Sequence, residues 1–357
     1  MSVSAEPVSA TGVVVVTGAA GALGRRVGAR LADDPAVGRV VELDRRTAAD
    51  RGEGPVDLLT DGDLKARMEG ADVVVHLATA FGPLLDDDPE VVSGADVEMA
   101  RRVLDAAAAA GVPHVVVLSS ATVYGAWANN PVPLTEDSPL RPDPGLAFAV
   151  QKAEVERLAL EWRDGHPGTT VAVLRPALAV AGDHPGWMGR ALRAATSVRG
   201  LDDNPPLQFL HLDDLAAAVD HARTARLDGP FNVAPDGWLT PTEFSQLAGG
   251  AARLRAPRAV VDRLASLRWR LRLAPVPPAV QAYAAHPWVV ANDRLRATGW
   301  APTARSEEAY VEATPAGPWA TLSPTRRQEL ALGGTAAAAV GAAGAALVLV
   351  RRRSRRP

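Results

Sequence analysis

The stretch VVVVTGAAGALG, residues 13–24, joins four consecutive valines to three glycines spaced three residues apart. A run of β-branched residues without polar interruption is typical of a parallel strand that is buried on both faces. Gly18, Gly21 and Gly24 then permit a tight turn, close approach of a phosphate to the backbone, and packing of the following helix against the strand. Because a helix N-terminus offers unpaired N–H groups to an anion, this stretch predicts a phosphate-binding strand–turn–helix unit.

Short apolar runs and alanine-rich helical stretches alternate over the first 180 residues. The apolar runs are Val13–Val16, Val40–Leu43, Val73–Leu77, Val115–Leu118 and Val171–Leu174. The helical stretches are Leu23–Ala32, Leu64–Met68, Val91–Ala110 and Ala149–Trp162. Such alternation predicts an α/β fold of the Rossmann type, with a doubly wound parallel sheet.

Proline, glycine and tryptophan become frequent after Pro176, which indicates a smaller lobe beside the sheet. We expect a dinucleotide-binding domain over residues 10–180, a substrate-binding lobe over 181–313 that interleaves with it, and a linker over 314–329. In the lobe we expect a helix over Leu212–Thr224 and a strand around Phe231–Val233. The basic stretch Arg263–Pro275 could clamp a nucleotide diphosphate, or it could form an amphipathic helix with a solvated or membrane-facing basic side.

The C-terminal region differs from the rest of the chain. Residues 330–350 carry no charge, and residues 351–357 contain five arginines. A helix of 21 residues would span roughly 30 Å, the thickness of the hydrocarbon layer. This predicts a transmembrane or membrane-associated helix; a flexible Ala/Gly tail is the alternative. Arginines after the helix favour a tail at the inner face of the membrane, holding a cytoplasmic domain. The N-terminus shows no signal peptide.

Composition excludes several kinds of site. The chain has no cysteine, so disulfides, thiolate nucleophiles and zinc–sulfur centres are excluded. Its seven histidines show no metal-binding spacing, and no metal is expected. A net charge of −3 gives no support for a nucleic-acid partner.

Acidic residues after two of the runs suggest the coenzyme. Asp44 ends the second strand about 20 residues after the glycines, where a carboxylate can accept hydrogen bonds from ribose hydroxyls. It favours NAD, because a carboxylate repels a 2′-phosphate. Arg45 and Arg46 could instead accept that phosphate, so NADP stays open. Asp57, expected to end the third strand after Val56, could bond the adenine or simply cap a turn.

Seven motifs resemble those of the extended short-chain dehydrogenase/reductases, and more narrowly the NAD-dependent epimerase/dehydratase group, which includes the UDP-glucose 4-epimerases. They are TGAAGALG (17–24), ELD (42–44), VDL (56–58), VVHLAT (74–79), LSSATVYG (118–125), LRPALAVAG (174–182) and QFLHLDDLAAAV (208–219). The resemblance covers roughly residues 10 to 310 and excludes the C-terminal tail.

The resemblance implies roles for matching positions. Ser120, helped by Thr122, would hydrogen-bond the substrate oxygen, and Lys152 would bond the nicotinamide ribose. His76, Leu77 and Ala78 would lie along the ribose and pyrophosphate, and Pro176 would flank the nicotinamide. Together with the glycine and aspartate arguments, the expected cofactor contacts are Thr17, Gly18, Gly21, Ala22, Leu23, Gly24, Asp44, Arg45, Asp57, Leu58, His76, Leu77, Ala78, Lys152 and Pro176. A nucleotide-sugar substrate and a homodimer are further expectations.

One position departs from the family pattern. The family's catalytic Tyr-x-x-x-Lys corresponds here to Phe148 and Lys152, and phenylalanine has no proton to exchange. Three interpretations follow: an enzyme with another proton carrier, a catalytically impaired NAD-binding sensor, or a membrane-associated scaffold. In the first, the carrier could be Ser120, Thr122, a water, a substrate group or Asp143. Loss of a general acid typically costs about 10²–10⁴ in rate, so an efficient epimerase is not expected.

Overall fold

The computed structural model describes residues 12–46, 55–80, 94–182, 184, 186–195, 198–200, 204–248, 254–271, 273 and 277–314. The linker beyond residue 314, the apolar segment 330–350 and the basic tail 351–357 lie outside these residues. Among the helices that are described, none is both long and apolar enough to cross a membrane.

A six-stranded parallel sheet forms the centre of the molecule, with the strand order β2-β1-β3-β4-β5-β9. The strands are β1 (Gly12–Thr17), β2 (Val37–Leu43), β3 (Val73–His76), β4 (His114–Leu118), β5 (Thr170–Pro176) and β9 (Gly229–Val233). Every pairing between them is parallel. The valine-rich interiors of β1, β3 and β4 are buried, as a sheet covered on both faces requires. The predicted doubly wound α/β fold is confirmed.

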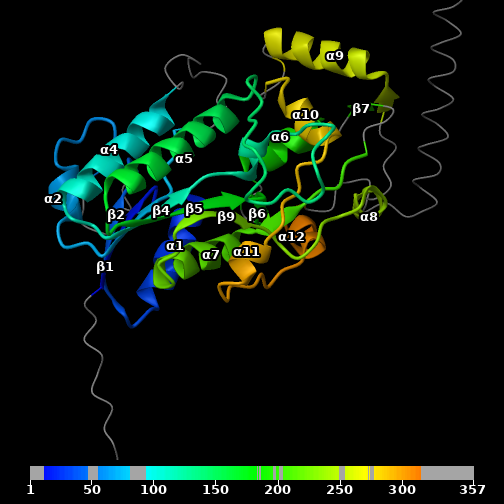
Figure 1. Ribbon diagram of the computed structural model, residues 1–357. Helices are drawn as coiled ribbons and strands as arrows, with labels where there is room; N and C mark the ends of the chain where they lie inside the picture. Colours follow the sequence, from blue (N-terminus) through cyan, green and yellow to red (C-terminus); the bar gives the residue numbers. More distant parts are fainter. Residues whose placement is uncertain are drawn as a thin grey trace, which may run out of the picture.

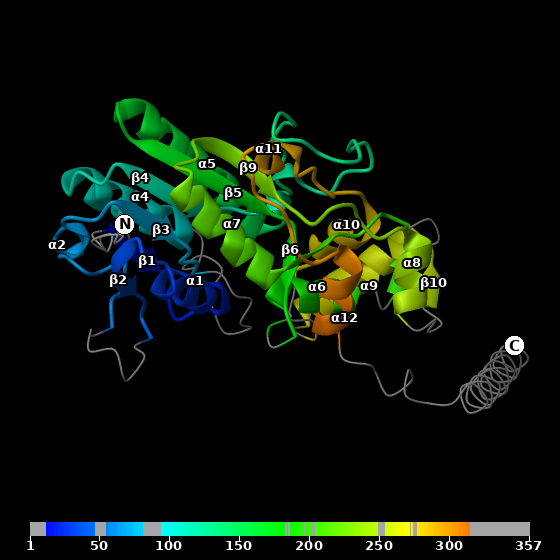
Figure 2. The same ribbon diagram turned by 90° about the horizontal axis from the view of Figure 1, so that it is seen from below.

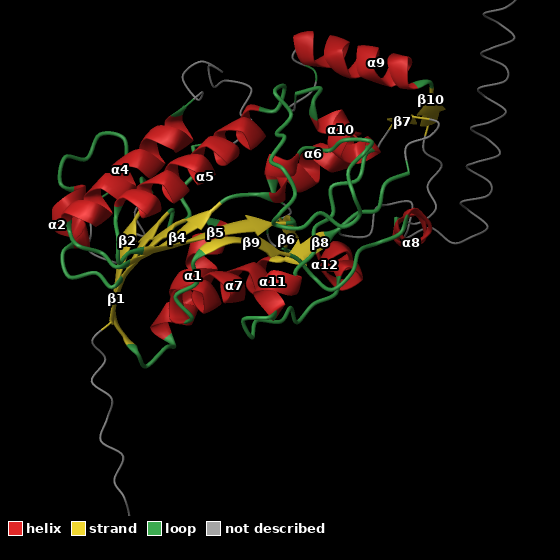
Figure 3. Cartoon of the chain, in the orientation of Figure 1, coloured by secondary structure: helices red, strands yellow, loops and turns green. Residues whose placement is uncertain are grey.

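Helices cover both faces of this sheet (Figures 1 and 3). One face carries α2 (Leu64–Met68), α4 (Ala95–Ala109) and α5 (Ala147–Gly165). The other carries α1 (Ala22–Ala32), α7 (Leu212–Thr224) and α11 (Asp293–Arg296). The buried apolar side chains accordingly form two clusters, one on each side of the sheet.

The remaining elements form a smaller group beyond the carboxyl ends of the central strands (Figure 2). Its strands pair in two short parallel ladders, β6 (Leu178–Val180) with β8 (Phe209–His211), and β7 (Val198–Gly200) with β10 (Leu254–Ala256). Its helices are α6 (Trp187–Ala195), α8 (Pro241–Leu247), α9 (Arg258–Arg270), α10 (Val280–Ala285) and α12 (Ser306–Ala313). A single 3-10 turn, η1 (Ala121–Tyr124), follows β4.

The structure corrects one expectation and shows the form of the basic stretch. Residues 55–57 form no strand; instead Asp57 Oδ1 accepts a hydrogen bond of 2.9 Å from Leu59 N, the turn-capping role left open above. The basic stretch is the helix α9, which lies at the outer edge of the molecule (Figure 1). Leu264 and Leu267 are exposed on this helix, and the clamp role stays a prediction.

Candidate active site

The glycine turn after β1 leaves no room for larger residues. Gly18 has a φ of 72°, in the left-handed region that favours glycine, and a Cβ there would lie 2.8 Å from Ala78 N. A Cβ on Gly24 would overlap the carbonyl oxygen of Gly18, so α1 can approach β1 only with glycine at this position. Gly21 N donates to Gly18 O at 3.0 Å and closes the turn.

Asp44 holds the glycine turn against the end of β2. Its Oδ2 accepts a hydrogen bond of 3.0 Å from Ala20 N, and its Oδ1 accepts one of 2.9 Å from Arg46 N. Arg46 Nε also donates to Asp44 Oδ1, at 3.4 Å, so these three bonds leave about one of the four lone-pair sites of the carboxylate for a hydroxyl donor. Arg45 and Arg46 are both exposed beside it.

A first cleft of about 640 Å³ opens at the ends of β1, β2 and β3. Eight of the expected cofactor residues line it: Gly18, Gly21, Asp44, Arg45, Asp57, Leu58, Leu77 and Ala78. Sequence motifs offer no reason to include several others that also line it, among them Leu59, Ala80 and Met99. The turn geometry, the remaining acceptor site of Asp44 and the volume of this cleft fit a dinucleotide lying from Gly18 to Asp57.

Thr17 and His76 do not line this cleft and lie behind it. Thr17 Oγ1 is 2.8 Å from His76 Nδ1 and accepts a hydrogen bond of 3.3 Å from Ala78 N. Both side chains are buried, so they shape the turn after β3 and do not face a ligand. Ala22 and Gly24 likewise line no described cleft.

Folding keeps His76 neutral. Burial, assisted by the Lys152 ammonium and opposed by Asp96, lowers the pKa of His76 to about 4, from a usual value near 6.5. Between these two values the unfolded chain binds a proton that the folded chain does not. We therefore expect the free energy of unfolding to fall by about 3 kcal/mol as the pH drops from about 6.5 to 4.

Urea unfolding at a series of pH values measures this loss, with His76→Asn as the comparison variant. The variant should have a flatter profile over this range. Parallel profiles for the two proteins would contradict the role given to His76.

A second cleft of about 230 Å³ follows β4 and β5. It contains Ser120 and Thr122, and Thr122 Oγ1 donates a hydrogen bond of 2.9 Å to Ser120 Oγ. Thr122 N donates to the same oxygen at 3.2 Å. Because Ser120 Oγ accepts both bonds, its own hydrogen is used in neither and can be donated to a substrate oxygen. Leu23 and Pro176, which were expected at the cofactor, line this cleft.

Phe148 forms part of the wall of this second cleft. Its ring meets Trp187 edge-to-face, with 5.1 Å between ring centroids, and Lys152 Nζ lies 5.8 Å from its centroid. The position that corresponds to the family's tyrosine therefore faces the cleft that holds Ser120, but it supplies an aromatic surface and no proton.

Lys152 is buried and lines neither cleft. Its Nζ lies 3.3 Å from Asp96 Oδ2, which also accepts a hydrogen bond of 2.6 Å from Thr79 Oγ1. Burial opposes ionisation of Asp96, but Lys152 and the bonds from Thr79 and Ala80 N hold the pKa of Asp96 below its usual value. The sequence carries no signal for this ion pair, since an acid in the first turn of α4 is ordinarily explained by the helix dipole.

The three tyrosines do not replace the missing phenol. Tyr124 donates to Asn232 Oδ1 and accepts from Arg175 Nη1, each at 2.8 Å, and burial raises the pKa of Tyr124 to about 12. Tyr283 donates to the Thr122 carbonyl at 3.0 Å, and burial raises the pKa of Tyr283 as well. Tyr310 lies in α12, away from the second cleft.

A buried network of Arg175, Glu156 and Ser119 lies next to the second cleft. Arg175 Nη2 donates to Glu156 Oε2 at 2.6 Å, and Arg175 Nε donates to the same oxygen at 2.9 Å. Ser119, the neighbour of Ser120, donates its hydroxyl to Glu156 Oε1. This network therefore fixes the backbone that carries Ser120 to helix α5 and strand β5.

Fold and site together define a Rossmann-type α/β protein with a dinucleotide cleft beside a second, hydroxyl-bearing cleft. Residues 14–234 match the family described as "NAD dependent epimerase/dehydratase family". The chain belongs to this family, as the motifs predicted.

Two relatives illustrate how far the likeness extends. An uncharacterized protein of Mycobacterium tuberculosis is 28% identical over 248 residues, which are 66% of each chain, just under two thirds of that relative. The 2'-dehydrokanamycin reductase of Streptomyces kanamyceticus is 30% identical over 216 residues, 58% of this chain and 56% of the relative.

Solved structures share the fold at lower identity. A Thermus thermophilus UDP-glucose 4-epimerase in complex with NAD has a TM-score of 0.63 at 19% identity, over 84% of this chain and 97% of that one. A short-chain dehydrogenase/reductase superfamily protein of Agrobacterium tumefaciens with bound NAD has a TM-score of 0.63 at 21% identity, over 90% and 99%.

Proposed function

We propose that the protein binds NAD(H) in the first cleft and carries out redox chemistry on a hydroxyl- or carbonyl-bearing carbon held in the second. The observation that carries the proposal is the placement of the two clefts. The glycine turn and Ala78 follow β1 and β3, and Ser120 follows β4, which is hydrogen-bonded to β3. Ligands of such sheets bind at this carboxyl edge.

The residues of the two clefts would have the following roles. NAD⁺, when bound, accepts a hydride, so that an alcohol and NAD⁺ give a carbonyl compound, NADH and a proton. Ser120 Oγ, oriented by Thr122, would hold the reacting oxygen by donating its hydrogen bond. Asp44 and the glycine turn would hold the adenosine and pyrophosphate groups. With phenylalanine at 148, the hydroxyl proton would leave to water or to a substrate group, and turnover would be slow.

Substrate and partners stay predictions. The Thermus relative is a UDP-glucose 4-epimerase, and the related MoeE5 is described in complex with UDP-glucuronic acid and NAD, which is the basis for expecting a nucleotide sugar. The homodimer and a cytoplasmic domain at the inner face of a membrane remain expectations from the sequence.

Coenzyme binding is tested by thermal denaturation of the full chain with NAD and with NADP. At 100 times its dissociation constant, NAD should stabilise the chain by about 2.7 kcal/mol, a rise of about 3–5 °C in Tm. NADP should stabilise it less, because its 2′-phosphate would lie near Asp44.

Two variants sharpen the test. Asp44→Ala should narrow the difference between the rises in Tm that NAD and NADP produce. The carboxylate that repels the 2′-phosphate is then gone, and Arg45 and Arg46 remain to contact it. Gly24→Ala should remove the NAD-dependent shift, because its Cβ displaces the turn that carries Gly18. If neither coenzyme stabilises the wild-type chain, the proposal fails.

A further inference from the structure

We infer that the second cleft takes an uncharged, largely apolar alcohol or ketone and not a nucleotide sugar. This inference rests on the proposed function, because it names the substrate class of the same site. The first observation is the kind of side chain around Ser120. Apolar groups from four parts of the chain surround the hydroxyl pair: Phe148, Leu178, Trp187, Met188, Leu215 and Trp288.

A nucleotide sugar carries two phosphates, which proteins recognise with arginine, lysine or helix N-termini. Among the described residues that line the second cleft there is no lysine or arginine, and His184 is the one side chain that can carry a positive charge. Burying a diphosphate among apolar groups without such partners is strongly unfavourable.

Three basic residues near the cleft are already paired with acids. Arg175 pairs with Glu156, Lys152 with Asp96, and Arg26 of α1 with Asp213 of α7 at 2.6 Å. The first two pairs are buried, so turning either cation toward a phosphate would leave a buried carboxylate without its partner.

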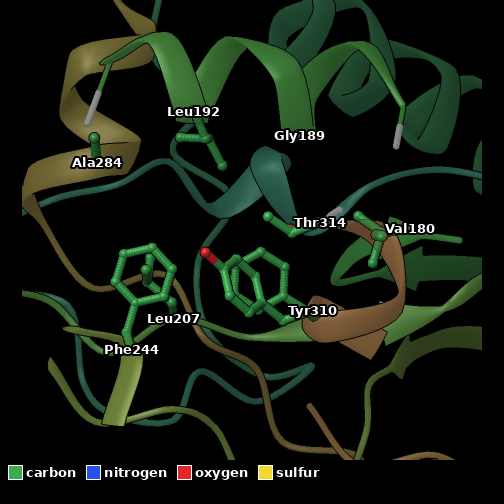
Figure 4. Close-up of a pocket in the computed structure, with 10 residues that line it drawn as sticks. Val180, Gly189, Leu192, Leu207, Phe244, Ala284, Tyr310 and Thr314 are labelled. Atoms are coloured by element: carbon green, nitrogen blue, oxygen red, sulfur yellow. The ribbon is translucent and has the colours of Figure 1, made fainter. Parts of the chain in front are cut away.

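A small cavity on the other side of β6 and α6 is also lined by apolar side chains. Neighbouring residues of these elements line the two spaces: Ala179 and Met188 face the second cleft, and Val180 and Gly189 face the cavity. Figure 4 shows Leu192, Phe244 and Tyr310 arranged around it. Its volume is about 40 Å³, and its described lining carries no charged side chain. This part of the lobe is therefore apolar on both sides of β6 and α6.

Together these surfaces predict a substrate with one polar oxygen for Ser120 and a flat, carbon-rich skeleton for Trp187 and Phe148. The edge-to-face packing of those two rings leaves an aromatic wall against which an aromatic or alicyclic skeleton can pack.

Binding to the NAD-saturated full chain tests the inference without any need for turnover. Tryptophan fluorescence is titrated with 1-tetralone, with UDP-glucose and with glucose as an uncharged polar control. We expect saturable quenching with tetralone and none with the other two. Saturable binding of UDP-glucose, or of none of the three, overturns the inference.

Trp187→Ala should weaken tetralone binding about tenfold, from the loss of the aromatic wall. Trp269→Ala, on the exposed helix α9, is the matched control and should leave the affinity unchanged. Equal affinities in the wild type and Trp187→Ala would place the ketone elsewhere and also contradict the inference. Coenzyme stabilisation measured in the same samples separates this result from failure of the proposed function.

Discussion

Replacing Phe148 with tyrosine is expected to raise the turnover number by about 10²–10⁴, the usual contribution of a general acid/base. This corresponds to about 3–5 kcal/mol of barrier. The new hydroxyl would extend from a ring that already lines the cleft with Ser120, and Lys152 Nζ lies 5.8 Å from that ring's centroid. The measurement is kcat for coenzyme reduction with an alcohol that the wild-type chain oxidises. KM should change little, because the ring of a tyrosine has the same shape as the phenylalanine ring it replaces.

The phenol itself gives a second readout. An ammonium nearby stabilises the phenolate, so the introduced tyrosine should titrate below pH 10, as followed by the difference in tyrosinate absorbance between variant and wild type. Adding Lys152→Met should raise that pKa and cancel the gain in turnover, and Phe148→Leu should give no gain. Equal turnover in wild type and Phe148→Tyr would show that this chain already has a proton carrier as effective as the phenol.

Removing the Glu156 carboxylate is expected to be the most destabilising single change at the site. Glu156→Ala would leave the buried Arg175 guanidinium without its carboxylate and Ser119 without its acceptor. Breaking a buried pair in this way costs about 3–5 kcal/mol, which urea unfolding would measure. Activity should fall as well, because Ser119 fixes the backbone that carries Ser120.

The same helix supplies a matched control. Glu154 pairs with Arg157 on the solvent side of α5, so Glu154→Ala should barely change the free energy of unfolding. The double change Glu156→Leu with Arg175→Met should recover most of the stability, since two apolar side chains replace both charges. Similar losses for Glu154→Ala and Glu156→Ala would contradict the role of the buried pair.

Local patterns were enough to predict the six strands of the central sheet and the glycine turn beside the first cleft. Unbroken valine runs mark strands buried on both faces, and helix bounds such as Leu64–Met68 and Leu212–Thr224 agree with the structure. The glycine turn and Asp44 are close in sequence to the elements they join, so their roles can be deduced from spacing. Helix α5 begins at Ala147 and ends at Gly165, longer at both ends than predicted, because helix ends carry weak signals.

Contacts between distant segments could not be predicted in this way. Asp96 and Lys152 lie on different helices, far apart in sequence. The residues around either one do not indicate that the other is its partner. His76 looks like a ligand-facing residue at a strand end, yet its bond to Thr17 turns it into the interior. The apolar wall of the second cleft combines Phe148 with Trp187 and Trp288, which come together only when the small lobe packs against the sheet.

The central claim is that NAD(H) binds in the first cleft with its nicotinamide end directed toward the second cleft, whose wall contains Trp187. Its most direct test is the fluorescence of bound NADH excited through tryptophan, which requires the two groups to be close. We predict sensitised NADH emission from the wild-type chain, much reduced in Trp187→Phe and unchanged in Trp269→Phe. Tight NADH binding with no sensitised emission, or with emission indifferent to Trp187, would contradict this account.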